Sequence, residues 1–192
     1  TLLGAVLGRC REVTMAYPGG CVIGQRPIDI HLSALRKMGV TIYEKEGCFT
    51  ARVKSLEGAV INLPISSVGA TENVILAAVM ARGVTVLQNA AKEPEIATLC
   101  EFLREAGAVI EGIGGSVLII QGGHELHGVS FRVPADRIVA GTYLMSVIGA
   151  GGNVFLEDAP ASQMRGMLKI ADEIGAQIHI TSEGLHENPD EH

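Results

Sequence analysis

The strongest constraint on the fold is a sequence pattern that recurs three times at one interval. Each copy has a stretch with helical spacing of apolar residues, then a glycine, then a short run suited to a β-strand. The copies occupy residues 35–42, 103–110 and 171–178, and their glycines are Gly39, Gly107 and Gly175. Both intervals between these glycines are 68 residues long. An interval repeated without a gap indicates a structural repeat.

Each copy predicts the same order of helices and strands. A helix ends at the glycine, which is suited to the left-handed conformation, and a strand, a turn and a second strand follow, as at residues 116–121. The second copy also has a front half: a helix over residues 70–81, a strand over 83–88 and a helix over 94–106. The unit is therefore β-α-β-α-β-β. It predicts an α/β (α+β) fold with helices packed on one sheet face.

The other two copies match this unit in part. The third copy has a helix over residues 136–148, a strand over 152–156 and a helix over about 161–174. The first copy begins inside its first helix, at residues 1–9. We therefore expect a longer parent protein that begins upstream of this chain.

Composition favours a globular protein that binds small molecules. Hydrophobic residues make up 47% of the chain and charged residues 19%, so the chain can form a core. The net charge is −6, and Lys and Arg are scattered singly, which argues against a nucleic-acid surface. An anionic small substrate is still compatible with this charge, because a basic pocket can lie on an acidic protein.

The cysteine spacing and the lack of cofactor motifs predict a protein without metal or cofactor. Cys10, Cys21, Cys48 and Cys100 are far apart and form no CxxC pair, and neither GK[ST] nor GxGxxG occurs. Cys10, Cys48 and Cys100 have apolar neighbours and are expected to pack in the core. No secretory signal and no apolar run of about 20 residues is visible. We therefore expect a cytoplasmic protein with free thiols and no membrane contact.

The most unusual segment is YPGGCVIGQRPIDIH, residues 17–31. Proline and three glycines around a lone Cys21 predict an exposed, flexible loop. Pro27 can open a helix over residues 28–38, so that Arg26 lies at a helix N-terminus. This arrangement suits an anion and would lower the pKa of a nearby thiol. Residue types alone leave open that Cys21 is an inert packing residue and Arg26 an ordinary surface charge.

Other polar residues also have two interpretations. His31 lies in the first turns of the expected helix and suits a packed or surface histidine as well as a ligand. Glu93 and Glu95 flank Pro94 and are typical of a helix start. Asp136 is a plausible helix N-cap first and a ligand second.

Four segments resemble the UDP-N-acetylglucosamine 1-carboxyvinyltransferases, in the superfamily that includes the shikimate-pathway enolpyruvyl transferase. They are residues 18–39, 67–78, 89–108 and 135–144, in the family's order and covering nearly the whole chain. The resemblance implies the inside-out α/β barrel fold of repeated β-α-β-α-β-β units, of which about two and a half to three are present. It implies that residues 1–134 are two units of the cysteine-loop domain, the first incomplete. Residues 135–192 would begin a second domain whose remainder is missing.

The resemblance also implies a reaction and a set of site residues. The enolpyruvyl group of phosphoenolpyruvate passes to the 3′-hydroxyl of UDP-N-acetylglucosamine with release of phosphate, the first committed step of peptidoglycan synthesis. Cys21 matches the loop cysteine that acts as general acid and is alkylated by fosfomycin, and Arg26 matches an arginine that holds phosphoenolpyruvate. Segments that line the substrate site are matched by Arg26, Pro27, Ile28, Asp29, Ile30 and His31, and by Ile65, Ser66, Ser67, Val68 and Gly69. Glu93, Asp136 and Arg137 fall at or near further motif positions.

The chain departs from this family in several ways. It lacks the N-terminal Lys-Asn pair, an upstream Arg and the C-terminal aspartate of the family, and Ile65 stands where some members have Lys. We therefore expect this chain by itself to be inactive. A non-catalytic module that binds a nucleotide sugar or a partner is the alternative, and the same fold with a different acceptor is a third hypothesis, against which the cysteine loop argues. The apolar face left by a missing domain predicts a homo-oligomer.

Overall fold

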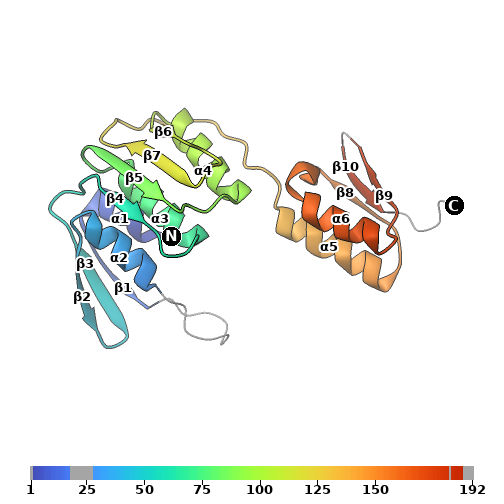
Figure 1. The fold of residues 1–192 in the computed structure, drawn as a ribbon, viewed down its shortest axis with the longest axis horizontal. Coiled ribbons are helices and arrows are strands. Elements are labelled where there is room, and N and C mark those ends of the chain that lie inside the picture. Colours follow the sequence, from blue (N-terminus) through green and yellow to red (C-terminus); the bar gives the residue numbers. More distant parts are fainter. Residues whose placement is uncertain (1, 18–27, 182, 188–192) are drawn as a thin grey trace. The chain divides into compact units, whose positions relative to one another are not determined.

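The structure is a computed structural model that describes residues 2–17, 28–181 and 183–187 (Figure 1). The chain forms two compact units, Thr1–Phe131 and Arg132–His192. The family resemblance predicts a domain boundary a few residues later, between Pro134 and Ala135. Assignment of the two units to separate domains of a longer protein stays a prediction.

The middle copy of the repeat is complete within the first unit. Its elements are β4 (Val60–Asn62), α3 (Val68–Ala78), β5 (Val84–Gln88), α4 (Pro94–Glu105), β6 (Val109–Glu111) and β7 (Val117–Gln121). β4 lies parallel to β5, and β7 is antiparallel to both β5 and β6, which gives the sheet order β4-β5-β7-β6. The predicted β-α-β-α-β-β order is confirmed in this copy.

The first and third copies repeat the same topology. The first copy contains α1 (Leu2–Cys10), β1 (Glu12–Ala16), α2 (Asp29–Lys37), β2 (Thr41–Lys45) and β3 (Cys48–Arg52). The third contains α5 (Arg137–Ala150), β8 (Val154–Glu157), the 3-10 turn η1 (Ala161–Gln163), α6 (Arg165–Glu173), β9 (Ile178–Ile180) and β10 (Gly184–Glu187). Their sheet orders, β1-β3-β2 and β8-β10-β9, correspond to β5-β7-β6. The three copies of the sequence pattern therefore share one strand topology.

The repeated glycine ends a helix in every copy. Gly39, Gly107 and Gly175 have φ angles of 91°, 107° and 88°, in the left-handed region. In each copy the N–H after the glycine donates to a carbonyl five residues back, at 2.9 to 3.2 Å, and the glycine N–H donates to one three residues back. These two bonds make a Schellman motif, in which glycine avoids the strain that a Cβ would cause.

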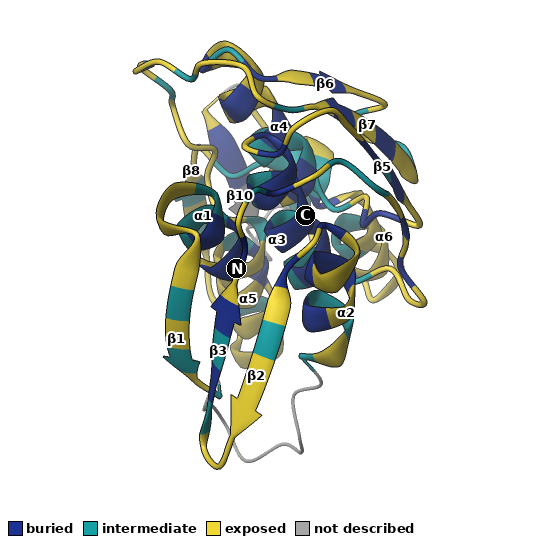
Figure 2. Cartoon of the chain, turned by 90° about the vertical axis from the view of Figure 1, so that its left-hand side faces the viewer, coloured by how far each residue is buried: buried dark blue, intermediate teal, exposed yellow. Residues whose placement is uncertain are grey.

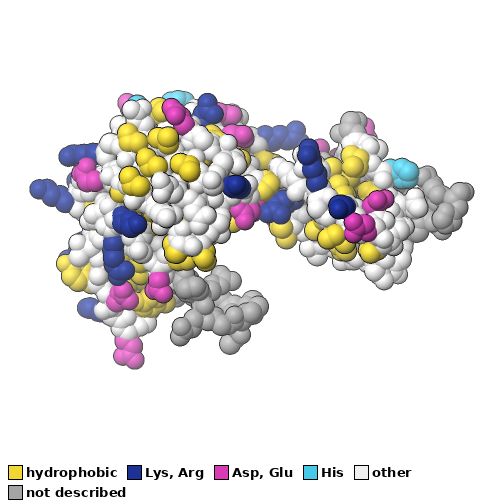
Figure 3. All heavy atoms as spheres, viewed as in Figure 1, with side chains coloured by type: hydrophobic (Ala, Val, Ile, Leu, Met, Phe, Trp, Pro, Cys, Tyr) yellow, Lys and Arg dark blue, Asp and Glu magenta, His cyan; other side chains and the backbone are white. Residues whose placement is uncertain are grey.

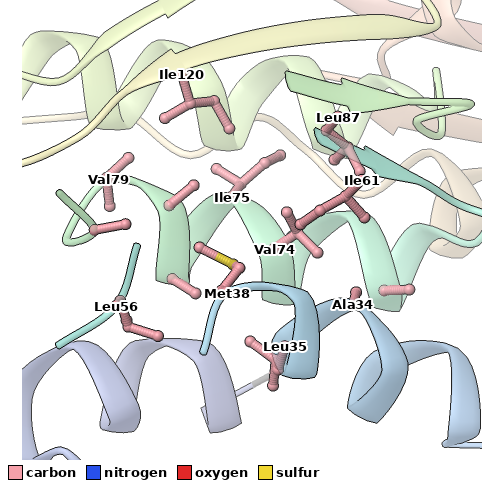
Figure 4. Packing of buried hydrophobic residues seen from close by; sticks show 14 of the residues in the cluster. Ala34, Leu35, Met38, Leu56, Ile61, Val74, Ile75, Val79, Leu87 and Ile120 are labelled. Atoms are coloured by element: carbon pink, nitrogen blue, oxygen red, sulfur yellow. The ribbon is translucent and has the colours of Figure 1, made fainter. Parts of the chain in front are cut away.

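The main core of the first unit surrounds α3. This helix is made of small and aliphatic residues, and most of its length is buried, whereas β1 and β2 are largely exposed (Figure 2). Val74 and Ile75 of α3 lie between Leu35 of α2 on one side and Ile61 and other sheet residues on the other (Figure 4). Burial of each aliphatic side chain contributes about 1.5–3 kcal/mol. α3 therefore holds α1, α2, α4 and the four-stranded sheet together.

The outer faces of the two sheets in the first unit differ. On β1-β3-β2 most outward side chains are polar, with Thr14 and Thr50 hydrogen-bonded at 2.8 Å, and Tyr43 is exposed beside them. On the four-stranded sheet Val60, Val84 and Ile119 are exposed, and apolar side chains gather over β5 and β7 (Figure 3).

The second unit has a small core and an interrupted helix. Leu144, Met164 and Leu185 are the buried members of its core cluster, and Ala171 is buried as well. The sequence predicted one helix over residues 161–174, but η1 ends at Gln163 and α6 begins at Arg165. Met164 turns its side chain into the core, with only 3% of its surface exposed, and its φ and ψ of −107° and 9° interrupt the helix. Core packing therefore overrides helix propensity at this residue.

Candidate functional site

The described part of the candidate site begins at Ile28. Cys21, Arg26 and Pro27 lie outside the described residues, so their predicted roles stay predictions. Ile28 is the N-cap residue of α2 and is half-buried, and Asp29 occupies the first turn. A carboxylate there interacts favourably with the positive end of the helix dipole. The next two residues, Ile30 and His31, are half-buried and lie on the same turn.

The second predicted segment, residues 65–69, forms the start of α3. Ser67 is the N-cap residue, and its Oγ accepts a hydrogen bond from the N–H of Ala70 at 3.4 Å. The neighbouring Ser66 donates from Oγ to the carbonyl of Ala90, also at 3.4 Å. The first N–H groups of an α-helix have no partner within the helix, so the turn at Val68 and Gly69 presents backbone donors. Ile65 is 58% exposed.

His31 brings the two segments together. Its ring lies against the first turn of α3, because a Cβ placed on Gly69 would be 3.2 Å from Cε1 of His31 and 3.6 Å from Nε2. On its other side, Nδ1 of His31 lies 2.9 Å from Nδ2 of Asn73. Burial lowers the pKa of His31 below its ordinary value. Residues 28–31 and 65–69 are therefore neighbours in space, although more than 30 residues separate them in the chain.

A pocket of about 190 Å³ lies next to this contact, between α2 and β4. It contains Asp29 and Ile30 of the first predicted segment, and Pro64, which precedes the second. Ser33 and Lys37 add polar and cationic groups from the next two turns of α2. The sequence reasoning missed these two residues, although their spacing of four places them on one helix face with Asp29.

The remaining predicted residues lie elsewhere. Glu93 is the N-cap residue of α4 but makes no side-chain capping bond, and its buried Oε2 has no hydrogen-bond partner among the described residues. Asp136 is the N-cap residue of α5 in the second unit, where Oδ1 accepts from the N–H groups of Ile138 and Val139 at 2.7 and 3.2 Å. Arg137 is the first residue of that helix. The capping interpretation of Asp136 is therefore confirmed, and its role as a ligand stays a prediction.

The described cysteines differ in exposure. Cys100 is buried, and burial raises the pKa of its thiol to about 11, so this cysteine is an unreactive packing residue. Cys48 is half-buried. The expectation of core packing is wrong for Cys10, which is the last residue of α1 and is exposed.

The described residues contain neither a cluster suited to a metal ion nor a helix suited to crossing a membrane. Within residues 2–17, 28–181 and 183–187, no group of three or more His, Cys, Asp and Glu side chains is placed to hold a metal ion. Over the same residues, no helix has the length and apolar character to cross a membrane.

The chain is similar in sequence to named enzymes of bacteria. It is 45% identical over 191 residues to the UDP-N-acetylglucosamine 1-carboxyvinyltransferase of Zymomonas mobilis, covering 98% of this chain and 45% of that protein. It is 46% identical over 186 residues to the enzyme of the same name from Sphingopyxis alaskensis, covering 96% of this chain and 44% of that protein. The chain thus spans about half the length of the curated relatives it matches.

Solved structures share the fold of this chain, and a family sequence model matches its sequence. The enolpyruvyl transferase NikO from Streptomyces tendae aligns with a TM-score of 0.81 at 20% identity, over 97% of this chain and 46% of that one. EPSP synthase from Acinetobacter baumannii aligns with a TM-score of 0.70 at 23% identity, over 97% of this chain and 45% of that one. At such identities these two structures show the fold alone. The sequence model of EPSP synthase (3-phosphoshikimate 1-carboxyvinyltransferase) matches residues 1–190, and the chain therefore belongs to the EPSP synthase family.

Proposed function

We propose that the protein to which this chain belongs transfers the enolpyruvyl group of phosphoenolpyruvate to the 3′-hydroxyl of UDP-N-acetylglucosamine and releases phosphate. The main support is the similarity to relatives of that name, at 42–46% identity over nearly the whole chain. The contact between residues 28–31 and 65–69 is consistent with it, because one substrate can touch both segments. The reaction would supply the precursor of peptidoglycan in the cytoplasm.

The described residues suit the nucleotide sugar. The N-terminus of α3 offers backbone N–H groups at Val68 and Gly69, which favour an anionic oxygen such as one of a diphosphate. The adjacent pocket has apolar walls, with Asp29 and Lys37 at its rim to bind polar groups of a ligand. Proposed roles for Cys21 as general acid and Arg26 as phosphoenolpyruvate ligand complete the site. Glu93, Asp136 and Arg137 are proposed as further substrate contacts.

Binding without turnover is the second candidate function for this chain taken alone. The pocket and both proposed nucleotide-sugar segments lie within the first unit. The chain spans 45% of the length of its relative from Zymomonas mobilis. We therefore propose that the chain alone binds the nucleotide sugar weakly and does not complete the reaction.

The test measures phosphate release and binding separately. The chain and a relative of full length, such as the Zymomonas mobilis enzyme, are mixed with phosphoenolpyruvate and UDP-N-acetylglucosamine. We expect phosphate release from the relative only, and calorimetric binding of UDP-N-acetylglucosamine to both. Turnover by the chain would refute its proposed incompleteness. Phosphate release from the parent protein with shikimate 3-phosphate, and none with UDP-N-acetylglucosamine, would refute the proposed acceptor.

The cysteine loop needs its own test. Fosfomycin is added to the full-length parent protein, and the mass of the loop peptide is measured. We expect a mass increase on Cys21 that is absent in Cys21→Ser, while Cys100 stays unmodified because burial raises the pKa of its thiol. Modification of Cys21→Ser protein at another cysteine would contradict the proposed role of Cys21.

We also propose self-association through the second unit. Ile138, Val139, Tyr143, Ile170 and Ile174 of this unit are 51–61% exposed. Such apolar surface favours association when no partner covers it. Sedimentation at increasing concentration should show a growing fraction of dimer or larger species. Substitution of Ile138 and Ile174 by Gln should reduce that fraction, and an unchanged fraction would contradict this surface.

A further inference from the structure

Asn73 lies where α3 meets both α1 and α2, and only 2% of its surface is exposed. A buried amide costs free energy unless its donors and acceptor are paired. Asn73 is paired in two directions. The N–H of Gly4 in α1 donates to Oδ1 at 2.7 Å, and Nδ2 lies 2.9 Å from Nδ1 of His31 in α2.

The N–H of Gly4 fixes the orientation of the Asn73 amide. A backbone N–H can only donate, so the amide atom that faces it must be the oxygen. The other amide atom is then the NH₂ group, which faces His31 and can also only donate. Nδ1 of His31 must therefore accept with a lone pair. A histidine that accepts at Nδ1 is neutral and carries its proton on Nε2.

We propose that Asn73 is a positioning residue that holds His31 in the neutral Nε2–H form and so presents a hydrogen-bond donor to the ligand of this site. The Cε1–Nε2 edge of the ring faces the first turn of α3, as its 3.2 and 3.6 Å distances to a Cβ placed on Gly69 show. The Nε2–H group thus lies beside the backbone donors of that turn. Together they suit the oxygens of a phosphate ester, and this ligand class rests on the proposed function.

Protonation of His31 would break the pair with Asn73. An imidazolium carries a hydrogen on Nδ1, which would point at the hydrogens of the Asn73 NH₂ group. Burial of the ring acts in the same direction, because the charged form loses solvation. The pair with Asn73 and the burial of the ring therefore both favour the neutral form, which carries the donor at Nε2.

The tautomer can be measured directly in the chain as it exists. The protein is labelled with ¹⁵N, and long-range proton–nitrogen spectra of the imidazole rings are recorded, with His31→Gln used to assign the His31 signals. We expect Nδ1 in the chemical-shift range of an unprotonated nitrogen and Nε2 in that of a protonated one. A proton on Nδ1, or a mixture of both tautomers, overturns the proposal.

The variant Asn73→Asp separates tautomer control from a structural role. It keeps the shape and an oxygen that accepts from Gly4, but it replaces the donor that faces His31 by an acceptor. We expect the proton to appear on Nδ1 and the pKa of His31 to rise by about 1 or more. Gln121→Glu, at an exposed position of β7, adds the same charge and should leave His31 unchanged. An unchanged His31 in Asn73→Asp refutes the positioning role, and the wild-type spectrum decides the matter if this variant does not fold.

A titration with UDP-N-acetylglucosamine tests the donor role. We expect the Nε2 and Nε2–H signals of His31 to shift on binding in the wild type, and to shift less in Asn73→Asp. Calorimetric binding without any shift at His31 refutes the donor role alone. Absence of binding refutes the proposed nucleotide-sugar site on this chain, whereas the tautomer spectrum then still confirms or refutes control by Asn73.

Discussion

Gly4 allows α1 to approach α3 closely enough for its N–H group to reach Asn73. A Cβ on Gly4 would overlap the backbone carbonyl oxygen of Asn73, which cannot move without bending α3. The same helix has a second glycine, Gly8, at which an added Cβ would meet the side chain of Met80 at 2.8 Å. The Cβ of Met80, at 2.9 Å, is fixed by the backbone, so this overlap is milder than the one at Gly4 but a rotamer change does not remove it.

We expect Gly4→Ala to destabilise the first unit by about 1–3 kcal/mol or more, because the added methyl group forces α1 away from α3. Gly8→Ala should cost less, since its overlap with Met80 is smaller than the overlap of Gly4→Ala with Asn73, and alanine favours the helix by about 1 kcal/mol. Urea unfolding of both variants measures the difference in free energy of unfolding. Equal losses in the two variants would contradict the close approach at Gly4.

His31 should make the stability of the first unit depend on pH. Burial lowers its pKa in the folded state, so the unfolded chain binds the proton more readily. The free energy of unfolding should therefore fall as the pH drops below about 6.5, the ordinary pKa of histidine, and level off below the folded pKa. Chemical unfolding at several pH values should show this slope in the wild type and a smaller one in His31→Gln.

The control for this pH dependence is His124→Gln, because His124 is exposed. An identical slope in the wild type and in His31→Gln would show that the folded protein does not hold His31 neutral.

Sequence reasoning predicted the helix cap at Asp136 but missed Asn73, and the cause is the range of the interactions. Asp136 bonds to N–H groups two and three residues away, so its role is visible in a short segment. The partners of Asn73 are 42 and 69 residues away. Only the packing of three helices brings them together, and no local pattern contains that information.

At the level of helices and strands, the glycine that follows the second helix of each copy was predictable, because its interactions are local. Gly39, Gly107 and Gly175 end their helices with local bonds, and the conformation they need excludes most other residues. The break at Met164 was not predictable, because it depends on the side chain entering a core made by α5 and β10. Local sequence rules thus predicted where these helices end, whereas tertiary packing determines the break at Met164.

Gly39→Ala should cost about 1–2 kcal/mol in the free energy of unfolding. The φ angle of 91° is unfavourable for a residue with a Cβ, whereas the space is free, since the nearest atom to that Cβ would be the Ser55 carbonyl oxygen at 3.7 Å. Gly39→Asn should cost less, because asparagine tolerates the left-handed region. Thermal or urea unfolding measures both. If Gly39→Asn lost more free energy of unfolding than Gly39→Ala, side-chain volume and not backbone strain would determine the stability at this position.

On the scale of the molecule, the repeat interval predicted three copies but not how stable each would be. The first two copies share one core around α3, in which α1 and α2 of one copy pack on a helix of the next. The third copy forms a unit by itself, and the buried members of its core cluster are Leu144, Met164 and Leu185. The sequence alone could not show this difference, because α3 and α5 are similarly apolar.

The two units should therefore unfold in separate steps, the second unit first. A small core offsets less of the conformational entropy lost on folding than a large one does. Hydrogen exchange should show lower opening free energies for the amides of β8 and β10 than for those of β5 and β7. Leu144→Ala should lower the first step by about 2–5 kcal/mol and leave the second unchanged, and Leu87→Ala should do the reverse. A single transition shifted equally by both variants would mean that the two units stabilise each other as one cooperative structure.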